Sequence, residues 1–489
     1  MNRFSRKFRG AINLTATVVI LFSMARAQQD PSSGGQQSGG AVPAATGPDT
    51  STQTIENPPL SGLDSPSFEL GFGARSYVLF KAQLSEAADT NATSNLASSG
   101  GISQVTQGLG SVSLQKLWKA HPLAVDYAGG AYAYHGKNGR IFQNHAMSAN
   151  QRFLWRTGQL TLRDSFSYLP QGSFGFSSFG GAGGFGGGVG GLGGGVTSGG
   201  GIAGGGGGGV FTNGQFGSIG NQPRITNMGI VDITQSLSPR SSVVLAGGYG
   251  IADFLSNPQG YTNSNQTVGQ VGYNYQLSRK DQIALTYAFQ QFHFPRLGGG
   301  SFNANVWQAL YGHRISGKVD LSLGGGPQLI RTFQTGIGVR SHLSGSGRAS
   351  LTYHASTRTS MLVSYTHYST PGSGFFAGAN TDDVRYSLNH ALTRRWSFMT
   401  DTGYSRNSRV LPVATKTANN ARVYNFWYAG GALHWQLSRH FGAFTSYQYD
   451  KFGFGSGFCS PGSPNCVHKY DRHVGMIGID WTPGPIRLD

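Results

Sequence analysis

Charge, cysteine and long apolar runs are all scarce in this chain. Only 12% of its 489 residues are charged, and just two are cysteines. Few charges together with 77 glycines and 12% aromatic residues suit short strands and loops better than helical domains. Beyond residue 27, no stretch reaches the ~18 consecutive apolar residues of a membrane-spanning helix, which excludes an α-helical membrane protein.

Motifs for catalysis and cofactor binding are missing as well. The chain contains no G-x-S-x-G elbow, no H-E-x-x-H pair and no P-loop. Its thirteen histidines are dispersed, and those on the polar face of one expected strand have no acid nearby. The sequence therefore predicts no enzyme activity and no cofactor.

The N-terminal segment predicts export. Four basic residues precede the apolar run "AINLTATVVILFSMA", and "ARA" provides a small-residue cleavage site ending at Ala27. The run is shorter than the ~20 residues that span a bilayer, which favours a signal peptide over residues 1–27 rather than an anchor. Cleavage would lower the formal charge from +17 to about +12, because the segment carries five basic residues and no acid.

The two cysteines, Cys459 and Cys466, delimit the short stretch "CSPGSPNC". In an oxidising compartment a disulfide that closes this loop is expected. His468 and His473 follow, but the spacing matches no standard zinc pattern, so no metal site is predicted.

A hairpin-like unit recurs along the chain. Units such as "YQLSRKDQIALTY" and "WQLSRHFGAFTSY" consist of two alternating apolar/polar runs joined by a short basic turn. The aligned hydroxyl residues of six such units are Ser238, Ser278, Ser316, Ser356, Thr393 and Ser438, spaced by 40, 38, 40, 37 and 45 residues. Alternation with a period of two indicates strands, so the repeated unit is a β-hairpin.

A soluble sandwich and a membrane barrel share this alternation, and three features favour the barrel. Many segments alternate for longer than the ~5–6 residues of soluble strands. The turns are short where the sequence repeats, whereas the other connections are long and polar. Five tryptophans cluster near the short-turn ends or the final strand end, as expected for an interfacial aromatic girdle: Trp118, Trp155, Trp396, Trp435 and Trp481.

The fold prediction is therefore an all-β, closed antiparallel transmembrane β-barrel with short periplasmic turns and long external loops. Eight short turns, with both termini periplasmic, require eighteen strands, the first of them around Ser67–Lys81. Sixteen strands is the alternative if that first segment lies outside the wall. The expected organisation is a signal peptide over 1–27, a disordered periplasmic tail over 28–65, the barrel over 66–483 and a C-terminal tail over 484–489.

With its signal peptide, its "L-S-R" turns and its alternation, the chain resembles Gram-negative outer-membrane β-barrel proteins, and porin-like ones in size. The resemblance covers residues 66–483 and indicates no particular family. It implies that outer-membrane lipid and the outer-membrane assembly machinery are partners, and it leaves homo-oligomerisation open. Trp481 takes the place of the terminal aromatic residue of such barrels, but eight residues follow it. An exported chain with scattered basic residues is not expected to bind nucleic acid.

The glycine-rich stretch 171–222 carries no charge and connects the fifth and sixth expected strands. Its G-x-G-x-x-G matches have no weight, because a dinucleotide site needs that motif between a strand and a helix. One interpretation is a flexible external loop. The other is a loop that folds into the lumen and narrows it, as the loop at this position does in porins.

Alternation also predicts which residues line the lumen. The basic set is Arg163, Arg314, Arg340, His342, Arg348, Arg385 and Arg422, and the acidic set is Asp126, Asp232, Asp401 and Asp450. Basic side chains in a pore favour anions, unless the two sets neutralise one another across the wall. The leading prediction for function is a passive, water-filled channel for small solutes. The alternatives are a non-conducting barrel for surface display or adhesion, and an export barrel for polysaccharide or polypeptide.

Overall fold

The computed structural model describes twelve stretches of the chain, which all belong to one compact unit. These stretches are residues 76–90, 101–118, 120–135, 140–169, 223–255, 262–295, 300–334, 338–356, 358–372, 376–411, 421–455 and 469–488. The signal peptide, the tail 28–65, the glycine-rich stretch 171–222 and both cysteines lie outside them. Regular structure in the described stretches is entirely β, and they include no helix long and apolar enough to cross a membrane.

Long antiparallel strands build the wall, each 12 to 19 residues in length. They are β1 (Tyr77–Asp89), β2 (Ser103–Lys116), β3 (Leu123–Tyr134), β4 (Arg140–Trp155), β5 (Gly158–Leu169), β6 (Arg224–Ser238), β7 (Ser241–Phe254), β8 (Ser264–Gln276), β9 (Asp281–Phe294), β10 (Gly300–Ser316), β11 (Val319–Gln334), β12 (Gly338–Ser356), β13 (Thr359–Thr370), β14 (Ala379–Ala391), β15 (Trp396–Arg409), β16 (Val423–Gln436), β17 (Phe441–Phe454) and β18 (Lys469–Trp481).

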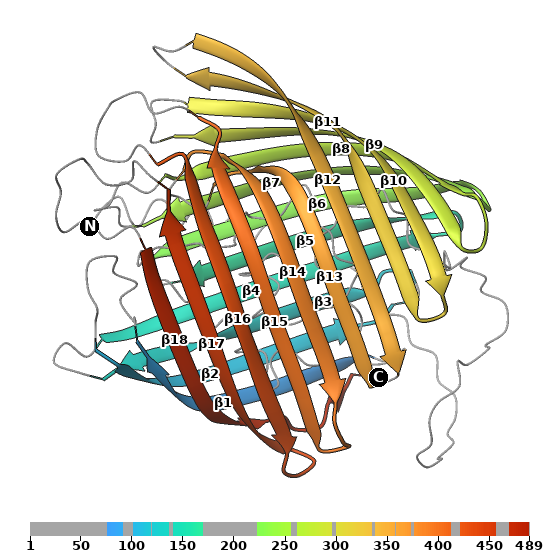
Figure 1. Cartoon of the computed structure of the whole chain (residues 1–489). Helices are drawn as coiled ribbons and strands as arrows, with labels where there is room; N and C mark the ends of the chain where they lie inside the picture. The colour runs from blue at the N-terminus through green and yellow to red at the C-terminus, as the bar shows by residue number, and fades with distance from the viewer. Residues whose placement is uncertain are drawn as a thin grey trace, which may run out of the picture. The chain divides into compact units, whose positions relative to one another are not determined.

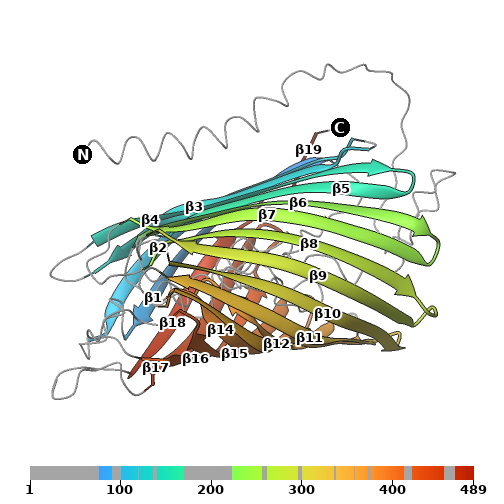
Figure 2. The same ribbon diagram turned by 90° about the horizontal axis from the view of Figure 1, so that it is seen from above.

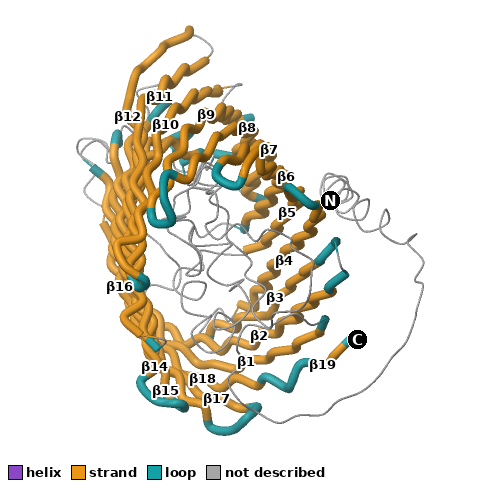
Figure 3. Tube along the Cα trace, turned by 90° about the vertical axis from the view of Figure 1, so that its right-hand side faces the viewer, coloured by secondary structure: helices purple, strands orange, loops and turns teal. Residues whose placement is uncertain are grey.

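The sheet closes on itself. Every strand pairs with its neighbours in sequence, and β1 pairs with β18 from Ala82 opposite Trp481 to Asp89 opposite Val474. Figures 1 and 2 show the strands running obliquely side by side, and Figure 3 shows them arranged in a ring with β1 beside β18. The predicted closed antiparallel barrel of eighteen strands is thus confirmed for the described residues, and the sixteen-strand alternative is wrong.

Both ends of the wall show detail beyond the sequence prediction. The first described wall strand is β1, Tyr77–Asp89, which overlaps the C-terminal end of the expected segment around Ser67–Lys81; residues 67–75 of that segment lie outside the described residues. The glycine-free stretch of β1 alternates over 13 residues and pairs fully with β2. In the expected C-terminal tail, the short strand β19 (Ile486–Arg487) pairs with the start of β1.

The repeated hydroxyl residues shape the short turns. Each of the six accepts a hydrogen bond from the backbone N–H two residues further on, at 3.0 to 3.3 Å. Ser278 also accepts one from the N–H of Asp281 at 3.0 Å. A Ser or Thr hydroxyl that accepts this hydrogen bond takes the place of a backbone carbonyl and stabilises a tight turn. The basic residues of the repeat point from these turns into water.

Connections at the opposite end, here called the loop end, are uneven. Only three residues separate β11 from β12, whereas residues 170–223 separate β5 from β6. Figure 1 shows the β11–β12 hairpin extending beyond its neighbours at this end. The expectation of long loops therefore holds for most connections but not for this hairpin.

Two aromatic belts delimit the outer surface of the wall. The five predicted girdle tryptophans are exposed at the short-turn end, where Trp396 and Trp435 stack with ring centroids 5.2 Å apart. A tyrosine belt lies nearer the loop end, and each hydroxyl bonds a polar residue on the next strand: Tyr127 to His145 (2.8 Å), Tyr287 to Asn305 (2.8 Å), Tyr365 to Asp382 (3.1 Å), Tyr404 to Asn425 (3.1 Å) and Tyr447 to His473 (2.7 Å).

The spacing of the belts matches a membrane. On β15, the outward Trp396 and Tyr404 are eight residues apart, about 27 Å along a strand at ~3.4 Å per residue. At a tilt of about 40° this corresponds to a depth of about 20 Å, close to the ~25 Å apolar band of membrane barrels. Between the belts the outward residues of β7–β18 are mostly apolar, as in Leu245, Leu285 and Leu351.

Candidate functional site: the lumen of the barrel

Polar side chains cover the inward face of β1–β8. The buried ones include Gln83, Ser85, Asp89, Gln107, Ser113, Gln115, Asp126, Ser148, Asn150, Thr161, Ser167, Thr226, Asp232, Thr234, Ser242, Ser264, Gln266 and Asn274. Within the described residues, neither terminal atom of Gln83 has a hydrogen-bond partner, nor do the side-chain nitrogens of Gln107 and Gln115. Buried amides without protein partners are costly unless water or another polar group meets them, so this wall suits a polar interior.

Two arginine–carboxylate networks tie neighbouring strands together from inside. Arg472 on β18 donates from Nε to Oδ1 of Asp89 on β1 at 2.9 Å, and both side chains are fully buried. This ion pair therefore bridges the first and last strands of the barrel. Elsewhere on the wall, Nε of Arg385 on β14 donates to Asp401 on β15 at 3.1 Å.

The inward face is not polar everywhere. Toward the loop end, β9–β11 and β16–β17 place apolar side chains inside, and we call these the lumen aromatic core. Its members are Phe292, Phe294, Phe302, Ala304, Val306 and Ile330 on one side, Tyr424, Phe426, Tyr428, Phe452 and Phe454 on the other, and Phe376, Ala377 and Leu411 from connections. The rings of Phe292 and Phe302 stack at 4.5 Å. Because this core is closed to solvent, it removes part of the loop-end cross-section from any water path.

The segment Phe376–Gly378, between β13 and β14, joins the two sides of the core. The ring of Phe376 packs on Tyr424 of β16 with centroids 5.0 Å apart, and the guanidinium of Arg409 lies over it at 4.5 Å. Gly378 has φ +78°, and a Cβ there would lie 2.3 Å from the ring of Phe302 on β10. Only glycine permits both this backbone conformation and this approach. The connection between β13 and β14 thus folds inward.

Three of the predicted lumen arginines are neutralised by aspartates. Arg163 forms an ion pair with Asp232, Arg385 pairs with Asp401, and Arg314 pairs with Asp320 at 3.1 Å near the short-turn end. The positive charges of these three arginines are therefore compensated by aspartates of the same wall.

The remaining basic residues of that set lie toward the loop end. Arg340 and His342 are exposed on the inward register of β12, and Arg340 makes no ion pair with any residue that the structure describes. Arg348 is further down the same strand and partly buried. Arg422 is exposed just before β16. Positive charge therefore concentrates at one side of the loop end.

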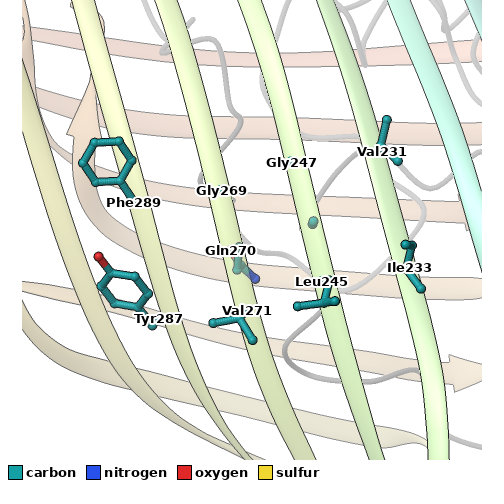
Figure 4. A pocket seen from close by; sticks show the side chains of 10 residues that line it. Val231, Ile233, Leu245, Gly247, Gly269, Gln270, Val271, Tyr287 and Phe289 are labelled. Carbon is teal, nitrogen blue, oxygen red and sulfur yellow. The ribbon is translucent and has the colours of Figure 1, made fainter.

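A hollow of about 560 Å³ opens on the outer face of the wall. It exists because Gly247 of β7 and Gly269 of β8 stand directly opposite each other, between larger residues such as Leu245, Val271 and Phe289 (Figure 4). Its lining is apolar and lies on the outer face between the two belts, apart from the lumen.

Among the described residues, no group of three or more His, Cys, Asp or Glu side chains could hold a metal ion. The tyrosine belt and the lumen aromatic core were not identified from sequence. Both depend on the register between neighbouring strands, although consecutive aromatic residues such as Tyr424 to Tyr428 were a visible sign of the core.

Comparisons with known proteins find matches among solved structures alone, at low sequence identity. No protein-family model and no curated protein matches its sequence. Solved structures that match include the FrpB iron transporter of Neisseria meningitidis (6% identity, 84% of this chain and 83% of that chain, TM-score 0.40). OccK2 (OpdF) of Pseudomonas aeruginosa matches at 9% sequence identity, covering 85% of this chain and 98% of that chain, with a TM-score of 0.41. OpdQ of the same organism matches at 10% identity, covering 84% of this chain and 98% of that chain, with a TM-score of 0.38. Similarity of this degree shows neither family nor function, so the role of the barrel follows from its own geometry.

Proposed function

We propose that this chain is an outer-membrane channel through which small hydrophilic solutes pass in a water-filled lumen. The predicted signal peptide and the apolar band between two aromatic belts support insertion in the outer membrane. The observation that carries the proposal is the set of buried amides on the inward face of β1–β8, such as those of Gln83 and Gln107. A closed barrel of this strand number is too wide for side chains alone to fill.

The water path is eccentric. The lumen aromatic core occupies the loop-end half of the inward face on β9–β11 and β16–β17. We expect solutes to pass along β1–β8, because most of the buried polar side chains face inward there. Two smaller apolar groups also face inward on these strands, one around Val105 and Tyr132 and the other formed by Met228, Ile230 and Val268. Narrowing by a fixed core limits conductance below that of an unobstructed barrel of the same size.

A weak preference for anions is part of the proposal. Because Arg163, Arg314 and Arg385 are paired with aspartates, the preference depends on Arg340 and Arg422 near the loop end. Charges at a pore mouth raise the local concentration of the opposite ion, and this effect weakens as salt increases.

The test is conductance of the purified mature protein in planar lipid bilayers. We expect discrete openings in KCl, and a reversal potential in a salt gradient whose sign indicates anion preference at low salt. Protein unfolded by boiling is the control. A protein that inserts, shows heat-modifiable mobility and never conducts would contradict the channel and favour a display barrel. Conductance with cation preference would overturn only the charge assignment.

A further inference from the structure

An incompletely neutralised arginine pair lies on the polar wall of the lumen. Arg152 on β4, Thr161 on β5 and Asp232 on β6 stand opposite one another in the strand register and face inward. Arg163 is the next inward residue on β5, one step toward the loop end. Four inward side chains on three adjacent strands thus form one cluster, within the path proposed for solutes.

The cluster has two guanidinium groups and one carboxylate. Arg163 forms an ion pair with Asp232. Arg152 interacts electrostatically with both of them, but its guanidinium makes no hydrogen bond or ion pair with any residue in the described part of the chain. One positive charge is left over at this point of the wall.

Hydrogen-bonding groups around the cluster are also unused. Nε of Arg163 and the hydroxyl of Ser148 have no partner within the described residues, although both atoms are buried. Ser148 belongs to β4, two inward steps from Arg152. The guanidinium, the N–H and the hydroxyl can each donate a hydrogen bond, whereas Asn150 Oδ1, which lies opposite Arg163 and is also without a partner among the described residues, can only accept one. Asp126, opposite Ser148, interacts with Lys81, so the cluster keeps a single net positive charge.

We propose that Arg152, Arg163 and Ser148 form a binding subsite for the carboxylate group of small organic anions that pass through the channel. A planar guanidinium matches the two oxygens of a carboxylate and can donate two parallel hydrogen bonds to it. Asp232 holds Arg163 in place and limits the net charge, which favours a singly charged group over a multiply charged one. This inference rests on the proposed channel and adds a solute class to it.

The experiment measures competition between acetate and chloride in single channels. Acetate added to both sides at constant KCl is expected to lower the chloride current of the wild-type protein. Inorganic phosphate, present mainly as a dianion, is expected to do so less effectively. In Arg152→Gln the acetate concentration for half-inhibition rises by about tenfold or more, as expected when charge-assisted hydrogen bonds are lost.

Two further variants separate binding from simple charge. Arg152→Lys keeps the charge but not the planar fork, and its half-inhibiting acetate concentration should rise severalfold while its reversal potential in KCl is unchanged. Arg314→Gln removes a positive charge close to the short-turn end, outside the cluster, and should leave acetate inhibition as in the wild type. All variants are compared after confirming heat-modifiable mobility, so a folding defect is detected separately.

The outcomes are distinct. If the wild type conducts, and acetate inhibits Arg152→Gln and Arg152→Lys at the same concentration as the wild type, the subsite is wrong and the channel stands. If Arg152→Lys behaves as the wild type, the cluster acts by charge alone and carboxylate recognition is overturned. If the wild type does not conduct at all, both proposals fail together.

Discussion

Replacing Arg472 by glutamine is expected to destabilise the barrel more than replacing its partner Asp89 by asparagine. Arg472 and Asp89 bridge β18 and β1 from inside, and neither side chain is exposed. Asp450 on β17 stands directly opposite Arg472 and is 1% exposed. One buried cation therefore serves two buried carboxylates, and the two substitutions leave different charges behind.

The magnitudes follow from that arrangement. Arg472→Gln leaves Asp89 and Asp450 without the cation between them, and an uncompensated buried charge costs about 3–5 kcal/mol. Asp89→Asn leaves Arg472 beside Asp450, so the loss is that of a charge-assisted hydrogen bond, about 1.5–3 kcal/mol. The double variant should be destabilised by less than the sum of the two, because both single changes remove the same interaction.

Equilibrium unfolding in urea, followed by tryptophan fluorescence in lipid vesicles, measures the free energy of unfolding of each variant. Arg314→Gln is the matched control, since its ion pair is about half exposed and contributes only about 0–1 kcal/mol. The reasoning is refuted if Asp89→Asn costs as much as Arg472→Gln. It is equally refuted if Arg472→Gln costs no more than the exposed control.

Three other substitutions test other parts of the structure. Gly378→Val places side-chain atoms against Phe302 and strains a φ of +78°, so it should displace the inward segment and raise single-channel conductance, whereas Gly269→Val on the outer face should not. Trp435→Ala removes a stacked pair of the girdle and should cost at least about 0.5–1.5 kcal/mol in the same urea assay. Ser278→Ala removes the acceptor of two turn hydrogen bonds at 3.0 Å and should cost about 0.5–1.5 kcal/mol in that assay.

The wall could be predicted from sequence because its two determinants are local. Alternation assigns each residue of a strand to a face, and the hydroxyl two residues before a backbone N–H marks each short turn, as Ser278 does before Lys280. Counting the turns then gives the strand number. The limits of β1 were less accurate because no short turn precedes it, so alternation alone had to define them.

Hydrogen-bond and ion-pair partners on neighbouring strands could not be predicted from such local rules. The hydroxyl of Tyr365 finds Asp382 only because β13 and β14 pair in one particular register. Likewise, the ion pair of Arg163 and Asp232 joins residues 69 positions apart. Sequence gave the sign and the face of each charge, but whether a charge is compensated depends on the register.

The lumen aromatic core explains where alternation stops being informative. Between the belts most outward side chains are apolar, so polarity usually identifies the face, although Val244 and Phe444 are apolar and buried inside. Toward the loop end, apolar residues face inward more often because other apolar residues meet them there. On β16, Tyr424 and Phe426 do so, whereas Trp427 faces outward opposite Tyr404 of the belt and Tyr428 faces inward one residue nearer the short turn. Aromatic residues on both faces of a strand, as in "YNFWY", therefore indicate a strand end at or beyond the tyrosine belt that packs on both faces. In a barrel of this width such a strand end obstructs the lumen, and the same signal in sequence predicts an eccentric path.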